Sequence, residues 1–473
     1  MSESTTTSNE DNIEKYTAVL IAQYLKKQGY DNTLKSFLKE SSIPMSVITA
    51  KNASDMQDDD DLKSIISERV GYNDHILENK LKDMSLNGQL PPIDLNRYPL
   101  KRWNVDCKLS GIKSRKTDGI PIMVNFCENS NDNIIVSTSS RQLEVCNSDL
   151  TTMTKLKNQQ NKAFGVVKFA GPIIGSNYNF VCSMFGEIVL YDELFKPLPG
   201  LTFKPHERMI THIQFSKIDS SSWYMLTASM DNTLKLNVLS LSNDIVTPKF
   251  DQIWSTKLLS ACTTLNMANT TVNINGKQVT RTVFFVTRMD FTHILCYSID
   301  NVKHIVDNCF NIALNNAQFS THSFNVRDVV LINTEKDHNR NDCIIEQTII
   351  CVATSHIPYM RLVMIEFPDL APWLTEESNI IKTYYDKILR NIATQIPQDS
   401  YSQPIMRYVS KFNGIIIGSD NGIYSIDLLN GESWKLDTST GIDTQRIKSI
   451  SFNQLKSELI IGTAMKVMYL CSV

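Results

Sequence analysis

The 473-residue sequence lacks the features that mark secreted and membrane-spanning chains. Its ten cysteines are scattered singly and form no CxxC pair, which favours buried, reduced thiols in an intracellular protein. No apolar run reaches the roughly 18 residues that a membrane span needs. The opening residues, MSESTTTSNEDN, are polar and acidic, so they do not resemble a signal peptide. We therefore expect a cytoplasmic or nuclear protein that does not contact a membrane.

An excess of charge of one sign is also missing. The chain has 47 Lys and Arg residues against 50 Asp and Glu residues, which gives a formal net charge of −3. Basic residues cluster in one short stretch, KSRK at 113–116, so we expect no direct binding of nucleic acid. Frequent Asn and Ser residues hint at a fungal source.

Motifs for catalysis or for cofactors are absent as well. The sequence has no GxSxG, no HExxH and no Walker loop, and its eight histidines are dispersed. The Asn275-Gly276 pair predicts a hairpin turn. The acidic run at 55–61 lacks the Gly and Glu positions of a calcium loop. We therefore expect no metal, no cofactor and no enzymatic activity, since an active site would have to be assembled from distant loops.

A helical hairpin is predicted near the N-terminus, after a polar segment at 1–13 that we expect to be disordered. The helical pattern starts at Glu14, Gly29 has the character of a helix C-terminus, and Asp31 suits the N-cap of a second helix. Two helices of about three turns each bury little surface, and domains this small usually need help from oligomerisation.

The residues of this hairpin, within 14–45, resemble the LisH motif. The matching positions, which are also the predicted dimerisation residues, are Leu20, Ile21, Tyr24, Leu25, Tyr30, Thr33, Leu34, Phe37 and Glu40, together with Gly29. The resemblance implies a dimerisation module in which two hairpins form a four-helix bundle. The alternative is a hairpin that packs on its own chain.

The segment at 46–100 is predicted to connect two domains. It contains the acidic run, a predicted helix at 61–86, and an extended proline-containing linker at 89–100. In LisH proteins a helix that follows the motif often extends the dimer, and we assign the predicted helix to that role.

An internal repeat predicts the fold of the remaining residues, 101–473. The clearest unit, HERMITHIQFSKIDSSSWYMLTASMDNTLKLNVL, resembles a WD repeat in which Asn237 replaces the terminal Trp. In that family, residues at the positions of His206 and Asp231 belong to a buried network that braces one blade, so we assign these two residues a structural role. The resemblance implies an all-β propeller of the WD type.

Counting the third strands gives seven blades. Each has an apolar residue after a polar turn, at Leu143, Ile188, Leu234, Ile294, Leu362, Ile423 and Val467. The successive intervals are 45, 46, 60, 68, 61 and 44 residues, so the middle blades must carry insertions. The chain ends after the third strand of the last blade, and an N-terminal strand at 102–112 is predicted to close the ring.

One insertion, at 376–396, is a candidate partner-binding segment. We interpret it as an amphipathic helix, or as a strand followed by a helix. On the helical interpretation one face holds Ile380, Ile381, Tyr384, Ile388 and Leu389. The alternative, which we favour, is that this face packs on its own blade.

The predicted function is that of a non-catalytic scaffold or adaptor in a multi-protein complex, self-associating through the LisH hairpin and binding other subunits through the propeller. LisH proteins with WD repeats are similar in plan to transcriptional co-repressor subunits and to regulators of microtubule motors, and the first resemblance suggests transcriptional or chromatin regulation. The alternative is a scaffold or substrate-recruiting subunit of a ubiquitin ligase.

Overall fold

The computed structural model describes most of the chain after residue 108 and the N-terminal hairpin. The described residues are 6–41, 44, 62, 66, 95, 98, 100, 102–103, 108–127, 133–156, 165–198, 202–241, 248–274, 277–315, 324–332, 348–375, 381–411, 414–436 and 441–473. Two compact units divide the chain, one formed mainly by Met1–Leu90 and the other by nearly all residues from Pro91 onward. The predicted helix at 61–86 and the acidic run lie outside the described residues, apart from Leu62 and Ile66.

The hairpin consists of α1 (Thr6–Lys27) and α2 (Asp31–Ser41). Gly29, with φ of 75°, ends α1. The amide of Tyr30 bonds to the carbonyl of Leu25, and that of Gly29 to the carbonyl of Lys26, which is the Schellman arrangement that a glycine allows. The first bond of α2 runs from the amide of Leu34 to the carbonyl of Tyr30, so the helix begins one residue earlier than a cap at Asp31 predicts.

The start of α1 corrects the expected disordered segment at 1–13. The helix begins at Thr6, eight residues before Glu14, and residues 1–5 lie outside the described part. A polar segment without apolar periodicity can extend a helix, because adding a residue to a formed helix costs far less than starting one.

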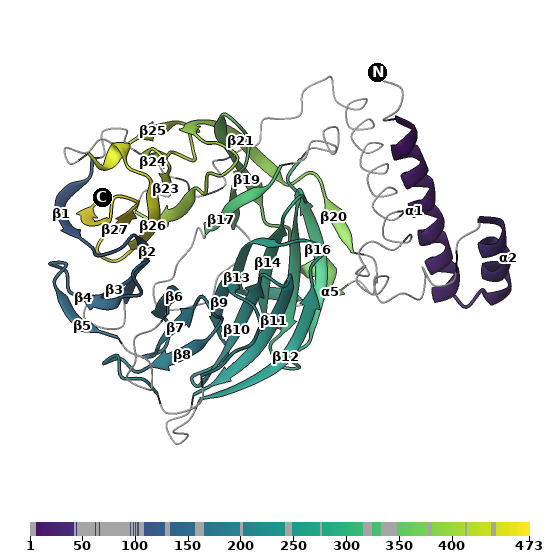
Figure 1. Ribbon diagram of the computed structural model, residues 1–473, viewed down its shortest axis with the longest axis horizontal. Coiled ribbons are helices and arrows are strands. Elements are labelled where there is room, and N and C mark those ends of the chain that lie inside the picture. Colours follow the sequence, from purple (N-terminus) through teal and green to yellow (C-terminus); the bar gives the residue numbers. More distant parts are fainter. Residues whose placement is uncertain are drawn as a thin grey trace. The chain divides into compact units, whose positions relative to one another are not determined.

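The second unit is a seven-bladed β-propeller, as the repeat count predicted (Figure 1). We number the blades in chain order and name the strands of each from its inner edge outward. Blade 1 consists of β2 (Pro121–Cys127), β3 (Asn133–Thr138), β4 (Leu143–Cys146) and β5 (Thr152–Lys155). Blade 2 consists of β6 (Val167–Pro172), β7 (Asn179–Ser183) and β8 (Ile188–Tyr191). Blade 3 consists of β9 (Ile210–Lys217), β10 (Ser222–Ser229), β11 (Thr233–Ser240) and β12 (Lys249–Lys257).

The later blades follow the same order. Blade 4 consists of β13 (Cys262–Ile274), β14 (Lys277–Arg288), β15 (His293–Asp300), β16 (Val306–Ala313) and, at its outer edge, β20 (Lys382–Tyr384). Blade 5 consists of β17 (Val326–Ile332), β18 (Ile349–Thr354), β19 (Tyr359–Glu366) and β21 (Ile388–Pro397). Blade 6 consists of β22 (Ile405–Val409), β23 (Gly414–Ser419), β24 (Gly422–Ile426) and β25 (Ser433–Lys435). Blade 7 consists of β26 (Ile447–Asn453), β27 (Glu458–Thr463), β28 (Val467–Ser472) and, at its outer edge, β1 (Ser110–Lys116). The short helices are α5 (Ala371–Thr375) and the 3-10 turn η6 (Ile442–Thr444).

The ring is closed by the pairing of β1 with β28, the last strand of the chain. The predicted closing strand at 102–112 is therefore misplaced, because only its last three residues belong to β1. Of the earlier residues, Trp103 is buried in the propeller outside its strands. Trp103 is 1% exposed, its ring packs at right angles to Trp434, and its amide donates to the carboxylate of Asp427. Alternating apolar residues predicted a strand here, but the bulk of Trp103 anchors a segment outside the sheets.

Residues of the predicted linker at 89–100 also pack on the propeller. Tyr98 is 3% exposed and donates its hydroxyl to Glu366 at 2.8 Å. Leu95 and Leu100 pack against the same apolar cluster, between blades 5 and 6. The segment before β1 is therefore held by two blades before it enters a third.

The hydrophobic core lies between neighbouring blades. Separate clusters join blades 1 and 2, 2 and 3, 4 and 5, 5 and 6, 6 and 7, and 7 and 1. Each middle strand is covered on both faces, so β18, β23 and β7 are buried along their whole length. This two-sided burial explains why the middle strands are continuous apolar runs instead of alternating ones.

A buried hydroxyl repeats from blade to blade. The second strand ends on Ser or Thr in six of the seven blades, at Thr138, Ser183, Ser229, Thr354, Ser419 and Thr463, each at most 4% exposed. These hydroxyls bond to the turn that follows: Ser183, for example, accepts from the amides of Phe185 and Glu187. Blade 4 ends its second strand on Arg288 instead, with Thr287 one residue earlier.

Hydrogen bonds within or next to the first strands also join the blades. From blade 7 to blade 1, Ser451 donates to Asn125; from blade 1 to blade 2, Asn125 donates to the carbonyl of Ala170; and from blade 2 to blade 3, Lys168 donates to the carbonyl of Thr211. From blade 3 to blade 4, Gln214 donates to the carbonyl of Leu265, and from blade 4 to blade 5, Asn266 donates to the carbonyl of Val329. The backbone amide of Met406 in blade 6 donates to Asp328 in blade 5, and Gln454 after β26 donates to the carbonyl of Tyr408 in blade 6. Every junction between neighbouring blades therefore has a polar link at or near the centre of the propeller.

The insertion at 376–396 is not helical where the structure describes it. It contributes β20 and most of β21, and Glu376–Ile380 lie outside the described residues. Ile392, Thr394 and Ile396 alternate as buried residues of β21, and this period of two is the strand signal that the helical interpretation missed. β20 pairs in parallel with β16, so this insertion covers the outer edge of blade 4. The predicted hairpin at Asn275-Gly276 is flanked as expected by the pair Ile274 and Lys277, although the two turn residues themselves lie outside the described part.

The anchoring of Trp103 gives a first prediction. A Cβ at Gly414 would collide with the Trp103 ring, so Gly414→Ala should destabilise the propeller by about 1–3 kcal/mol through overpacking. Trp103→Ala should cost about 3–5 kcal/mol through the cavity that it leaves. In the double variant the methyl group added at position 414 should cost much less than it does beside the intact Trp103 ring. Denaturant unfolding of the four proteins measures this coupling, and additive costs would contradict the contact.

Candidate interaction sites

The predicted dimerisation residues of the hairpin fall into three classes of exposure. Leu20 and Leu34 are buried, at 5% and 2% exposed. Ile21, Tyr24, Leu25 and Phe37 are half-buried, and Tyr30, Thr33 and Glu40 are exposed. A small cluster around Ala22 and Leu34, with Leu25, Phe37 and Leu38 against it, forms the core of the hairpin. The motif thus supplies both this core and apolar side chains that remain partly open to solvent.

The predicted structural pair in blade 3 is part of a chain of four polar side chains. The His206 ring lies 2.8 Å from the hydroxyls of both Thr227 and Thr233, and Thr233 donates to the carboxylate of Asp231. Since Thr233 donates its hydroxyl proton to Asp231, the neutral ring that fits this network carries its proton on Nδ1 and donates it to Thr233. Burial lowers the pKa of His206 to about 4, which keeps the ring neutral at physiological pH. The network joins β10 to the turn before β11, and the structural role of the pair stays a prediction.

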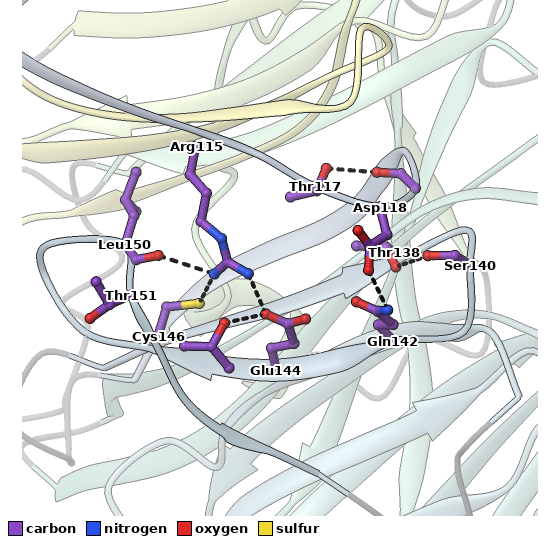
Figure 2. Close-up of polar contacts among 12 residues, drawn as sticks. Arg115, Thr117, Asp118, Thr138, Ser140, Gln142, Glu144, Cys146, Leu150 and Thr151 are labelled. Atoms are coloured by element: carbon purple, nitrogen blue, oxygen red, sulfur yellow. Dashed lines mark hydrogen bonds and ion pairs between the residues drawn. The ribbon is translucent and has the colours of Figure 1, made fainter.

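A second network joins β1 to blade 1 (Figure 2). The guanidinium of Arg115 donates to the carboxylate of Glu144 at 2.7 Å and to the carbonyl of Leu150 at 3.0 Å, and it also contacts the sulfur of Cys146. Thr152 donates to the same carboxylate at 2.6 Å. Burial alone would raise the pKa of Glu144, but the hydrogen bonds from Thr152 and Arg115 outweigh it and lower the pKa. Arg115 thus ties the closing strand of blade 7 to the neighbouring blade.

A small cavity lies beside this network. It has a volume of about 30 Å³ and is lined by Arg115, Lys116, Thr117, Asp118, Val136, Thr138, Gln142, Glu144 and Met468. Its polar walls and its size suit an ordered water molecule and leave no room for a substrate.

The candidate partner-binding residues of the insertion are dispersed. Leu389 is 9% exposed and belongs to the cluster between blades 5 and 6, while Tyr384 and Ile388 pack against the cluster between blades 4 and 5. Ile381 is 38% exposed, and Ile380 lies outside the described residues. The four described residues do not share one exposed face.

Sequence reasoning missed both the hydroxyls that bond to the turns within blades and the residue, Arg115, that joins two blades. The hydroxyls that end the second strands recur four to eight residues before each third-strand marker, and that spacing was the available signal. Arg115 was noted as part of a basic stretch, and its pairing partner lies 29 residues further on in a different blade. Such partners cannot be assigned before the register of the ring is known.

Reactive chemistry is not evident in the described part of the chain. No group of three or more His, Cys, Asp or Glu side chains there could hold a metal ion. All eight described cysteines are free and buried, and burial raises the pKa of thiols such as Cys182, Cys262 and Cys471 to about 12. Among the helices described, none has the length and apolar character to cross a membrane.

The buried histidines predict how stability depends on pH. Burial lowers the pKa values of His206, His212 and His293 to about 4, from 6.5 in an unfolded chain. The unfolded chain therefore binds more protons than the folded chain below pH 6.5, so stability falls as the pH drops from 6.5 toward 4. Thermal unfolding between pH 7.5 and 5.5 should show a falling Tm, and His212→Gln should flatten that profile. An identical profile for the variant would contradict the assignment.

Comparisons with known proteins agree with both units. The family model described as UCP007778, beta-propeller domain, matches residues 84–472, and the one described as UCP007778, LisH domain, matches residues 15–49. A relative from Saccharomyces cerevisiae, named "Uncharacterized protein YGR117C", is 36% identical over 473 residues, which covers 97% of each chain. With its LisH hairpin and its seven-bladed propeller, the chain belongs to the UCP007778 family.

Proposed function

We propose that this protein is a non-catalytic scaffold that self-associates through its LisH hairpin and binds partner proteins through its propeller. The observation that carries the proposal is the combination of a small helical hairpin, with partly exposed apolar residues, and a closed, rigid propeller in one chain. The two architectures are typical of protein–protein interaction.

The hairpin supports self-association through its incomplete burial. Ile21, Tyr24 and Phe37 are half-buried, and Tyr30 is 54% exposed. An isolated pair of short helices gains little from its own contact, and a second copy offers a complementary surface of the same kind. A four-helix bundle of two hairpins would bury these side chains.

The propeller supports a platform role through its rigidity. Its core, its closing strand and its polar links between first strands bind every blade to its neighbours. Loops and turns at the strand ends are thus held in fixed relative positions, which lowers the entropy cost of binding a partner. Two propellers on one dimer would bind a bivalent partner with increased avidity, provided the geometry allows both to engage.

A non-catalytic role agrees with the state of the titratable groups. The described thiols are buried with raised pKa values, and the buried histidines are neutral members of the packing. The finer role within this class, in transcriptional or chromatin regulation, is a hypothesis that rests on the resemblance to other LisH proteins.

Self-association gives a direct test. Ile21→Asp with Tyr24→Asp places two carboxylates on the half-buried positions of α1, while Lys35→Glu changes an exposed residue of α2 as a matched control. We expect wild type and control to elute with the mass of two chains in light scattering, and the double variant with the mass of one. The propeller should unfold at an unchanged temperature in all three. A wild-type protein that remains a single chain at micromolar concentration would contradict the proposal.

Partner binding is tested by mild purification of the full-length chain followed by mass spectrometry. Stoichiometric companions that are lost with a propeller-face variant would support a platform. Deacetylases or DNA-bound factors among them would support the chromatin role, whereas recovery of the chain alone in every condition would contradict the scaffold.

A further inference from the structure

Blade 4 contains a β-hairpin that extends beyond the rest of its sheet. β13 and β14 have 13 and 12 residues, whereas the first and second strands of the other blades have between 5 and 8. β15 pairs with β14 only from Arg281 to Val286. The last four pairs of the hairpin, from Thr271 with Thr280 to Ile274 with Lys277, therefore lie past the end of β15. We call these residues, 271–274 and 277–280, the blade 4 arm.

The arm is held at its base and on one face. Asn269 accepts a hydrogen bond from Ser216 and donates one to the carbonyl of Lys217, and both bonds tie β13 to blade 3. Val272 is 8% exposed and belongs to the apolar cluster between blades 4 and 5, against which side chains of α5 also pack. The arm therefore has a fixed place on the propeller.

One edge of the arm is open. A two-residue turn makes its flanking residues, Ile274 and Lys277, a hydrogen-bonded pair, and the bonds of an antiparallel ladder alternate from there. The N–H and C=O groups of Gln278 and Thr280 therefore point away from β13, to the side on which β15 has already ended at Asp300. No hydrogen bond joins these four groups to another described residue.

This edge lacks the devices that protect exposed strands. Open backbone groups pair readily with other chains, so native edges are usually covered or carry a charge or a proline. The outer edge of the same blade is covered, since β20 pairs with β16. On the arm, Gln278 and Thr280 are exposed, and neither they nor Val279 between them is charged or a proline. A strand from another chain could approach here without meeting a protective group among the described residues.

Two exposed apolar side chains lie beside the open edge. They belong to the turn between β15 and β16, which Thr282 of β14 holds by donating to Asn301 at 2.9 Å. Val302 is 88% exposed, the highest value among the large apolar residues described, and Ile305 is 51% exposed. The carboxylate of Asp300 accepts the amide of Val302, which fixes the position of this residue. An apolar contact is thus available next to the row of open backbone groups.

We propose that the open edge of the blade 4 arm binds an extended segment of a partner protein, which adds as a strand beside Gln278–Thr280 and places an apolar side chain on Val302 and Ile305. The four open groups are two donors and two acceptors at strand spacing, which the main chain of an extended segment matches. A helix has its backbone groups already bonded within itself, so it cannot match them. The inference deepens the proposed scaffold role and rests on it.

The test uses short random peptides displayed on phage and selected on the full-length protein. Thr280→Pro removes one outward N–H of the edge, leaves the bonds to β13 in place and suits an edge position. Val302→Asp removes the apolar contact without changing the backbone. Leu455→Asp is the matched control, because it puts the same carboxylate on a turn of blade 7 where Leu455 is 81% exposed. The melting temperature of each variant checks its folding.

We expect the selected peptides to alternate apolar and polar residues and to bind the wild type and Leu455→Asp equally in fluorescence polarisation. Thr280→Pro and Val302→Asp should each weaken binding by about tenfold or more, and so should N-methylation of the peptide amides that face the arm. Hydrogen exchange at single-residue resolution should show fast amides at Gln278 and Thr280 in the free protein and protected ones with the peptide bound.

The proposal is overturned if the selected peptides bind both edge variants as tightly as the wild type, or if the amides of Gln278 and Thr280 exchange slowly in the free protein. Protection that rises with protein concentration alone would also overturn it, because it would assign the edge to a second copy of the chain. In a mild purification, companions that both edge variants retain would overturn this edge and leave the scaffold role intact. A wild-type protein that recovers no companion would contradict the scaffold role, even where the selected peptides bind the edge.

Discussion

The pairing of β1 with β28 is the contact on which the propeller depends. Strands from the two ends of the propeller sequence meet in blade 7, and without this pairing blade 7 would lack its outer strand. The segment around β1 reinforces the closure on both sides. Tyr98 is buried between blades 5 and 6, Trp103 between blades 6 and 7, and Arg115 reaches from blade 7 to blade 1. One segment of the chain therefore holds four of the seven blades in place.

The packing between blades explains which parts of the fold the sequence predicts. All seven third-strand markers, from Leu143 to Val467, lie in third strands, because each of these strands contributes apolar side chains that pack between the blades. The LisH hairpin was equally visible, since its core residues and its Gly29 turn are local in sequence. The closing strand and the insertion at 376–396 were misread because their partners, β28 and β16, lie far away in the sequence.

The candidate sites also divide into those whose partners are close in sequence and those whose partners are distant. The contact of His206 with the Asp231 network lies within one repeat unit, and the structural role of the pair stays a prediction. The contact of Arg115 with Glu144 could not be predicted, because the two residues lie in different blades and meet only when the ring is closed. A platform role would depend on the closed ring, since an open ring would separate the turns of neighbouring blades.

Hydrogen exchange of the full-length protein, read by mass spectrometry, tests the closure most directly. If β1 is an integral strand of blade 7, peptides covering Ser110–Lys116 should exchange as slowly as peptides covering β28, and both should open in the same cooperative unit. Fast exchange of Ser110–Lys116 beside a protected β28 would show that the ring is held by the other contacts, and it would contradict closure by the N-terminal strand.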